Sequence, residues 1–186
     1  EGTIKLSQPG LTAKVLASAN MTDCASSKTP AKLGVLGIDP DGEPFDEPWT
    51  MPSINGQLLY LCQNTRPDLQ FAVSQTCRFN HQPKKSHATA IKHILRYLKG
   101  TPDVGLIVKK AKNLRMDVYV DADFAGGYGY EPPSESVSAK SRMGFVIYLG
   151  GLFPLLWKSK LIDCICLSTA EAEYSALSQC LREFIP

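Results

Sequence analysis

The hydrophobic pattern of the chain changes its period near residue 103, and this change restricts the fold more than any other feature. In the stretch 84–100, apolar side chains recur every three to four residues and would lie on one face of a helix; they are Ile91, Ile94, Leu95 and Leu98. From Met116 to Asp121, apolar and polar residues alternate, which is the period of a half-buried strand. The pattern therefore predicts an α+β fold, with a helical first part and a strand-rich second part.

Local periodicity and the placement of Gly and Pro divide the chain further. We expect residues 1–36 to combine an extended stretch with a short amphipathic helix, and the acidic, Pro-rich residues 37–52 to form a surface loop. Within a helical segment at 53–103, helices are predicted close to 52–63, 66–80 and 84–98. Within 104–186, strands are predicted at 104–108, 116–121, 144–149, 155–157 and 164–167.

The last predicted element is a helix that begins with a capping box. Ser168 and Glu171 have the spacing at which a serine hydroxyl and a glutamate carboxylate bond the first free amides of a helix. The apolar residues that follow recur at helical spacing, and we expect them to face inward; they are Tyr174, Leu177, Leu181 and Phe184.

Charged residues are segregated along the chain, although the formal net charge is only +2. Residues 49–116 carry eleven basic and two acidic side chains, whereas the blocks on either side are acidic overall. On the 84–99 helix the cations form a stripe separate from the apolar stripe: Lys85, Lys92, Arg96 and Lys99. Lys84, directly before them, is a further candidate for nucleic-acid binding. Such a stripe is often only a solvated surface. Beside a buried apolar stripe, it is also how a helix lies along a phosphate backbone.

Composition excludes several classes of protein. With 44% hydrophobic residues the chain can build a core and is not a disordered tail. No apolar run approaches the roughly 20 residues of a membrane span, so we expect no membrane partner. Six cysteines without zinc spacing predict buried thiols in a reducing compartment. Because a secretory signal is missing as well, we expect an intracellular location, in the cytoplasm, a virus-like particle or the nucleus, and no secretion.

Two pairs of carboxylates in the second part are candidates for chemistry. Asp121 and Asp123 stand at the end of a predicted strand, and Glu171 and Glu173 stand in the first turns of the predicted last helix. Glu171 is committed to the cap, which leaves Glu173 free. One carboxylate from each element could share a Mg²⁺ ion, which prefers oxygen ligands. On spacing alone, a helix cap and a chain turn explain these acids more simply.

Four sequence strings in the second part, taken in order, are far more specific. They are YVDADFAG (119–126), SRMGFVIYLGG (141–151), PLLWKSK (154–160) and LSTAEAEYSAL (167–177). Together they resemble the ribonuclease H region of copia-type LTR retrotransposon Pol polyproteins. Upstream, residues 53–73 and 87–106 resemble the segment that joins reverse transcriptase to ribonuclease H in these polyproteins, and the opening residues resemble the end of the reverse transcriptase palm. The resemblance covers nearly the whole chain.

The resemblance implies a reverse-transcriptase thumb- or connection-like helical segment, followed by a truncated RNase H-like α/β domain over 104–186. It also implies hydrolysis of the RNA strand of an RNA–DNA hybrid with two Mg²⁺ or Mn²⁺ ions. By position, Asp121 and Glu173 match catalytic, metal-binding carboxylates of the family, and Asp123 belongs to the motif as a support residue. The expected partners are an RNA–DNA hybrid or another nucleic acid and the remainder of the Pol polyprotein.

The sequence departs from the family pattern in two places. The paired aspartates of the polymerase site are absent, so we expect no polymerase activity. The chain also stops before the strand that would supply the third RNase H aspartate. We therefore expect weak metal binding, little nuclease activity and a 116–121 strand left at an unpaired sheet edge. Because the first residue is Glu1 rather than Met, we expect the chain to be a piece of a longer protein.

Two alternatives to an enzyme fragment stay open at the level of sequence. The first is a catalytically inert nucleic-acid-binding module, or a degenerate element, that uses the basic stripe of the 84–99 helix. The second is a glycosidase that uses paired acids and needs no metal, which the resemblance makes remote.

Overall fold

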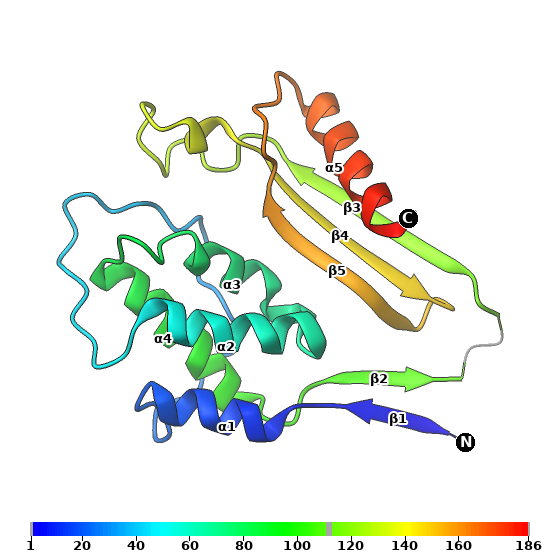
Figure 1. Ribbon diagram of the computed structural model, residues 1–186, viewed down its shortest axis with the longest axis horizontal. Coiled ribbons are helices and arrows are strands. Elements are labelled where there is room, and N and C mark those ends of the chain that lie inside the picture. The colour runs from blue at the N-terminus through cyan, green and yellow to red at the C-terminus, as the bar shows by residue number, and fades with distance from the viewer. Residues whose placement is uncertain (1, 111–112, 186) are drawn as a thin grey trace. The chain divides into compact units, whose positions relative to one another are not determined.

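The computed structural model describes residues 2–110 and 113–185, and of Phe184 only the backbone. The chain forms two compact units, one of Lys5–Ile107 and one of Glu1–Ile4 together with Val108–Pro186. Strands β1 (Thr3–Leu6) and β2 (Leu106–Lys109) pair in a two-stranded sheet that contains the residues at which the chain passes between these units. Each unit is described by itself below (Figure 1).

The unit of residues 5–107 is helical. Its elements are α1 (Pro9–Ser18), α2 (Met51–Asn64), the short 3₁₀ helix η1 (Pro67–Leu69), α3 (Gln70–Cys77) and α4 (Lys85–Gly100). These helices share one apolar core, in which Leu58, Val73 and Leu95 are fully buried. The predicted inward face of α4 is confirmed, because Ile91, Ile94, Leu95 and Leu98 are at most 1% exposed.

The single helix predicted at 66–80 is two elements in the structure. The chain first makes the 3₁₀ turn η1 and then enters α3 at Gln70. The α-helix ends at Cys77 because the next amides bond three residues back: Phe79 N–H donates to Thr76 O, and Asn80 N–H donates to Cys77 O. Such bonds tighten the last turn of a helix and prevent its continuation.

A histidine fixes the start of α4. The side chain of His87 is fully buried, and its Nδ1 accepts a hydrogen bond from the Lys84 backbone N–H at 2.9 Å. Its Nε2 lies 2.8 Å from Gly37 O, a carbonyl that can only accept. The ring is therefore neutral, with its proton on Nε2, and it stacks on Phe79 at a centroid distance of 4.0 Å. His87 thus anchors the beginning of the 37–50 loop to the helix.

The other unit is a sheet with one covering helix. Strands β3 (Met116–Asp123), β4 (Arg142–Leu149) and β5 (Phe153–Leu161) form an antiparallel sheet in the order β3-β4-β5. β3 is therefore an edge strand of the sheet that the structure describes, as the sequence led us to expect. Helix α5 (Thr169–Phe184) packs mainly against β3 (Figure 1).

The inward face of α5 differs from the prediction. Three small residues one turn apart are fully buried against the sheet: Ala172, Ala176 and Cys180. The side chains predicted to face inward are exposed instead, Tyr174 by 74%, Leu177 by 42% and Leu181 by 39%; the side chain of Phe184 lies outside the described residues. The reason is steric, because the sheet already fills its side of the interface with large residues of β4: Met143, Phe145 and Ile147.

Two strand predictions also differ from the structure. The stretch 164–167 contains no strand, and its two cysteines are not equivalent, since Cys164 is exposed and Cys166 is buried. The strand predicted at 155–157 is longer than expected, because β5 pairs with β4 along nearly its whole length despite Pro154. In the residues that the structure describes, each helix is too short or too polar to cross a membrane.

Candidate functional site

Strand alternation directs the Asp121 and Asp123 side chains. Val120 and Ala122 of β3 pack against the core that α5 covers. Because successive side chains of a strand point to opposite faces, Asp121 and Asp123 project from the other face of the sheet. Asp121 pairs with Gly144 of β4, so no side chain stands beside it on the neighbouring strand. Both carboxylates are exposed.

Asp123 lies against the turn that follows β3. A Cβ placed on Gly126 would come within 1.9 Å of the Asp123 carboxylate oxygen Oδ2, so a larger residue at this position of the turn would displace the Asp123 side chain. The turn is also fixed by the Ala125 N–H, which donates to Ser141 Oγ at 3.2 Å, and Ala125 itself has a positive φ of 48°. Asp123 is therefore built into a tight turn, whereas Asp121 is not.

Glu171 takes part in the cap of α5 and Glu173 does not, as the sequence predicted. Ser168 Oγ accepts a hydrogen bond from Glu171 N–H at 3.1 Å, and Glu171 Oε2 accepts one from Leu167 N–H at 2.7 Å. Glu171 is thus occupied in the cap of α5. Glu173 is exposed and, among the described residues, makes no hydrogen bond or ion pair.

The structure brings Asp121 and Glu173 to the same end of their unit. Helix α5 runs alongside β3 in the opposite direction, so the first turns of the helix lie near the last residues of the strand (Figure 1). The two side chains do not leave on the same side, because Glu173 belongs to the helix that covers one face and Asp121 projects from the other. Their oxygens suit Mg²⁺ chemically, but the described residues contain no group of three or more His, Cys, Asp or Glu side chains that could hold a metal ion.

The predicted basic face lies on α4, and an acidic loop neutralises part of it. Lys85 forms an ion pair with Glu43, and Lys92 forms one with Glu47. Lys84 Nζ donates to the carbonyl oxygens of Pro40 and Gly42 at 3.3 Å. The hydrogen bond to Glu43, more than any other effect, raises the pKa of Lys85 above its ordinary value. These pairings were not predicted.

The remaining two cations of the stripe are accessible to a ligand from solvent. Arg96 and Lys99 are exposed, and neither has an ion-pair partner in the part of the chain that the structure describes. They lie three residues apart near the C-terminal end of α4, so their side chains share one side of the helix. The opposite overall charges of blocks 1–48 and 49–116 were the sequence signal from which the pairing with the loop could have been found.

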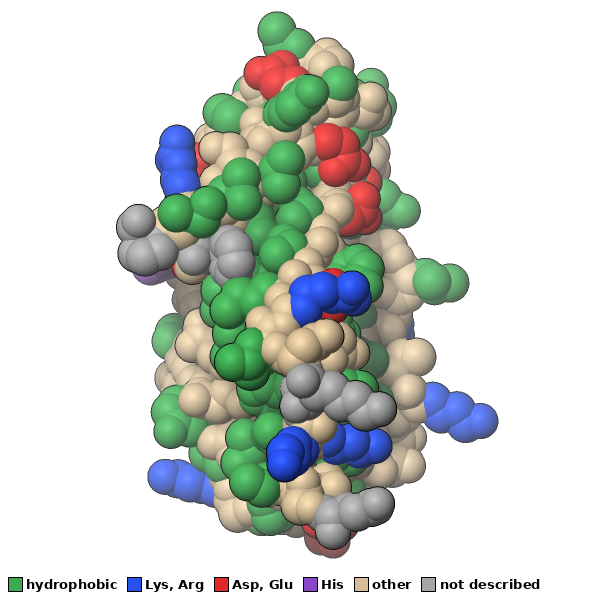
Figure 2. Space-filling view, turned by 90° about the vertical axis from the view of Figure 1, so that its right-hand side faces the viewer, with side chains coloured by type: hydrophobic (Ala, Val, Ile, Leu, Met, Phe, Trp, Pro, Cys, Tyr) green, Lys and Arg blue, Asp and Glu red, His purple; other side chains and the backbone are tan. Residues whose placement is uncertain are grey.

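An apolar surface on unit Val108–Pro186 was also missed by the sequence analysis. The outward face of α5 exposes Tyr174, Leu177 and Leu181, and Ile185, directly after the helix, is exposed as well. Figure 2 shows hydrophobic side chains at the surface in its upper third, the height at which Figure 1 draws α5. Exposed apolar side chains gathered on one helix face are unusual on an isolated soluble domain and mark a surface that is open to contact.

Comparisons with known proteins give relatives but no family model and no solved structure that match. The chain is 34% identical over 180 residues to a retrovirus-related Pol polyprotein from transposon RE2 of Arabidopsis thaliana, an alignment that covers 97% of this chain and 12% of the polyprotein. It is 33% identical to a retrovirus-related Pol polyprotein from transposon TNT 1-94 of Nicotiana tabacum, over 97% of this chain and 13% of that protein.

A shorter relative aligns over most of its own length. The chain is 32% identical to an uncharacterized mitochondrial protein of Arabidopsis thaliana, over 93% of this chain and 68% of that protein. The chain thus spans about an eighth of the length of the polyproteins that it matches. Since the similarity extends over nearly all of its residues, the chain is homologous to a segment of the retrovirus-related Pol polyproteins from transposons.

Proposed function

We propose that unit Val108–Pro186 contributes the carboxylates of a ribonuclease H site in a retrotransposon polyprotein of copia type. The observation that carries the proposal is the meeting of the end of β3, with Asp121, and the start of α5, with the unengaged Glu173, at one end of this unit. Two divalent cations held there would supply the chemistry of phosphodiester hydrolysis, one by activating water and the other by stabilising the leaving oxygen. The reaction would cut the RNA strand of an RNA–DNA hybrid.

The residues of this chain have distinct parts in the proposed site. Asp121 and Glu173 supply negative charge for a cation and are the proposed catalytic pair. They lie on opposite sides of β3, which is an edge strand of the described sheet. Asp123 supports the site by closing the turn over Gly126. Gly144, opposite Asp121, leaves room for a phosphate group to approach.

Metal binding and cleavage test the proposal separately. With Mn²⁺ added to the full chain, paramagnetic broadening of amide NMR signals is expected first at residues 121–123 and 171–174. Asp121→Asn and Glu173→Gln should each abolish it. Asp117→Asn is the matched control, because Asp117 lies on the same face of β3 and pairs with Arg115. Broadening confined to other acidic residues would overturn the proposed site.

Cleavage is measured on an RNA–DNA hybrid labelled on the RNA strand. Slow cleavage with Mg²⁺ or Mn²⁺ is expected, with loss in Asp121→Asn, in Glu173→Gln and after addition of a chelator. Glu183→Gln, at the other end of α5, should cleave as well as the unmodified chain. Cleavage that survives the chelator or both carboxylate changes would exclude this function.

A nucleic-acid-binding module is the second candidate, and the exposed pair Arg96 and Lys99 favours it. Binding to a short hybrid is expected to weaken steeply with salt, with a slope of about −0.9 for each phosphate neutralised. The double change Arg96→Gln with Lys99→Gln should lower the slope by about two. Lys14→Gln, an exposed lysine of α1, is the control. If the hybrid is bound but never cut, this module replaces the nuclease.

A further inference from the structure

An irregular segment of the helical unit, residues 26–36, lies along the C-terminal half of α4. The backbone N–H of Ser27 donates to the Arg96 carbonyl oxygen at 3.1 Å. One residue earlier, Ser26 lies so close to Gly100 that a Cβ on this glycine would come within 3.0 Å of the serine Cβ. The segment therefore runs antiparallel to the helix and in direct contact with it.

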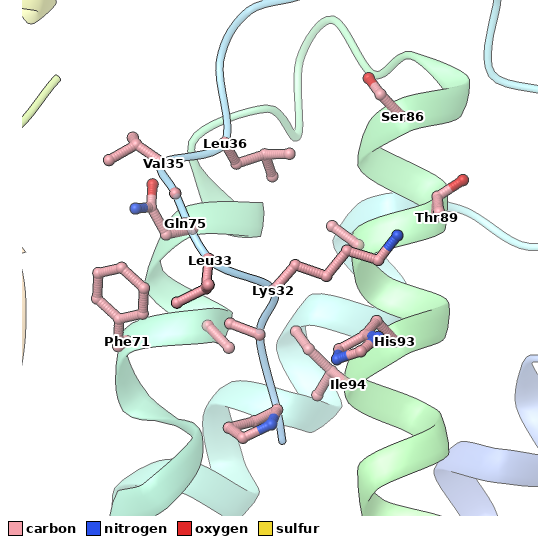
Figure 3. Close-up of a pocket in the computed structure, with 15 residues that line it drawn as sticks. Lys32, Leu33, Val35, Leu36, Phe71, Gln75, Ser86, Thr89, His93 and Ile94 are labelled. Atoms are coloured by element: carbon pink, nitrogen blue, oxygen red, sulfur yellow. The ribbon is translucent and has the colours of Figure 1, made fainter. Parts of the chain in front are cut away.

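The later part of the segment continues along the same helix toward its N-terminus. Residues 30–36 pass over α3 and α4 and form with them a pocket of about 320 Å³ (Figure 3). Lys32 is exposed, and Figure 3 shows its side chain extending from the segment toward Thr89 of α4. Lys28, directly after the residue that bonds the helix, is exposed as well. Both lysines of the segment are thus carried beside α4.

The two flanks of α4 carry opposite charge. On one flank, the acidic loop pairs with Lys85 and Lys92. His93 follows directly, so its side chain leaves the helix about 100° further round, and its Nε2 lies within 3.5 Å of two hydroxyl oxygens of the segment. On this second flank the segment supplies Lys28 and Lys32 and contains no acidic residue.

Arg96 lies between the two flanks. It follows Lys92 by four residues and His93 by three, which places it about 40° from the first side chain and about 60° from the second. The exposed cations of the segment and of this end of the helix form one surface, here named the basic surface: Lys28, Lys32, Arg96 and Lys99. None of the four has an ion-pair partner among the described residues. The acidic loop therefore leaves this surface uncompensated.

We propose that the basic surface binds the phosphates of one strand of an RNA–DNA hybrid. From Thr89, beside Lys32, to Lys99 the helix rises about 15 Å. One strand of a DNA duplex carries a phosphate for about every 3.4 Å of its axis, so this length spans about four phosphates, one for each cation. Contacts to phosphates position a duplex without reading its sequence. The inference rests on the nucleic-acid-binding module proposed above, and it adds the segment 26–36 to that module as a second element.

The test measures binding of a short labelled hybrid to the full chain by fluorescence anisotropy across a salt series. Lys28→Gln with Lys32→Gln should lower the slope of log affinity against log salt by about two, because about 0.9 is lost with each phosphate contact. Lys14→Gln with Lys109→Gln is the matched control, since it removes the same charge from exposed lysines of α1 and β2. The control should keep the slope of the unmodified chain.

Amide NMR gives a second readout that depends on place rather than on charge. Addition of the hybrid should shift the Ser27 and Thr29 amides saturably. In the variant Lys28→Gln with Lys32→Gln these shifts should be lost, while the thermal unfolding midpoint stays unchanged because both side chains are exposed. Shifts that leave residues 26–32 unaffected would overturn the inference.

The outcomes separate this inference from the module itself. If Arg96→Gln with Lys99→Gln lowers the salt slope and Lys28→Gln with Lys32→Gln does not, the segment takes no part in binding. The inference is then overturned and the module stands. Equal losses in the segment variant and in its control would overturn the inference too, since net charge alone would explain them. A chain that does not bind the hybrid at all would overturn both.

Discussion

Glu47, in the loop between α1 and α2, forms an ion pair with Lys92 in the middle of α4, and both side chains are partly shielded from water, with 14% and 32% of their surfaces exposed. Glu43 of the same loop pairs with Lys85, about two helical turns earlier. An acidic segment therefore lies along the helix face that the sequence assigns to nucleic acid. Loop and phosphate backbone would compete for the same cations.

Removal of the loop charges is expected to strengthen nucleic-acid binding. Glu43→Gln with Glu47→Gln frees two lysines, so affinity for a short RNA–DNA hybrid should rise several-fold at low salt and the salt slope should steepen by up to about two. Fluorescence anisotropy across a salt series measures both. Asp23→Asn with Asp103→Asn changes the net charge equally, at two carboxylates that form no ion pair with the stripe among the described residues. Equal effects of the two double variants would show that only net charge matters.

Loss of the Asp68 carboxylate is expected to destabilise the helical unit. Arg66 is 1% exposed, donates to both oxygens of Asp68, and also donates to the Thr101 carbonyl. Asp68→Ala leaves that guanidinium buried without its counter-charge. Because Asp68 itself is partly exposed, we expect a loss of about 2–3 kcal/mol, below the usual range for a fully buried pair. Urea unfolding measures it, with Asp103→Ala as an exposed control; a loss equal to that of the control would contradict the prediction.

The cysteines are expected to differ widely in their reaction with iodoacetamide. Burial raises the pKa of the Cys62 thiol to about 12 and that of Cys77 to about 11. A higher thiol pKa means less of the reactive thiolate, so at pH 8 only about one Cys62 side chain in ten thousand is ionised. Cys164 is exposed and should react first. Mass spectrometry of peptides after timed labelling gives the order, and equally fast labelling of Cys62 in the folded chain would contradict the described core.

The two faces of α5 should respond oppositely to changes of size. Ala176 is fully buried against the sheet, so Ala176→Leu overpacks the interface and should cost about 1–3 kcal/mol. Leu177, on the exposed face, should tolerate Leu177→Ala within about 0.5 kcal/mol. Thermal or urea unfolding compares the pair. The opposite order of sensitivity would restore the inward face first expected from the sequence.

The edge position of β3 predicts an alternating pattern of hydrogen exchange. On one side its amides pair with β4, and on the other they find no strand among the described residues. In an antiparallel pair, every second amide bonds the neighbour. We therefore expect protection at alternate residues of 116–123 and fast exchange at those between. Uniform strong protection would show that the outer edge is paired in solution.

The helical unit could be predicted well because its strongest signal is local. The stripe of Ile91, Ile94 and Leu98 has the spacing of a helix face, and that spacing holds whatever the helix packs against. The face of α5 could not be predicted in the same way. There, large apolar residues compete with small ones for the interface, and the bulk of Phe145 and Ile147 on a distant strand decides the outcome.

The candidate sites also differ in whether their sequence signals are local or join distant residues. Short sequence patterns reveal the strand end that places Asp121 and the helix cap that places Glu171 and Glu173. The pairing of Glu47 with Lys92 joins residues far apart along the chain, so only the opposite charges of the two blocks hinted at it. The pocket that segment 30–36 forms with α3 and α4 has no sequence signature, because it arises from how this irregular segment crosses the two helices.

Gly144 is a glycine that the fold does not require, and its lack of a side chain affects the surface beside Asp121. An added methyl group there would meet only the Lys158 carbonyl oxygen, at an ordinary 3.9 Å, so the strand itself does not require glycine. The glycine instead leaves the Asp121 carboxylate without a side chain beside it on the neighbouring strand. Alanine at this position would fit the sheet and add one methyl group beside the Asp121 carboxylate. Tryptophan would cover that carboxylate.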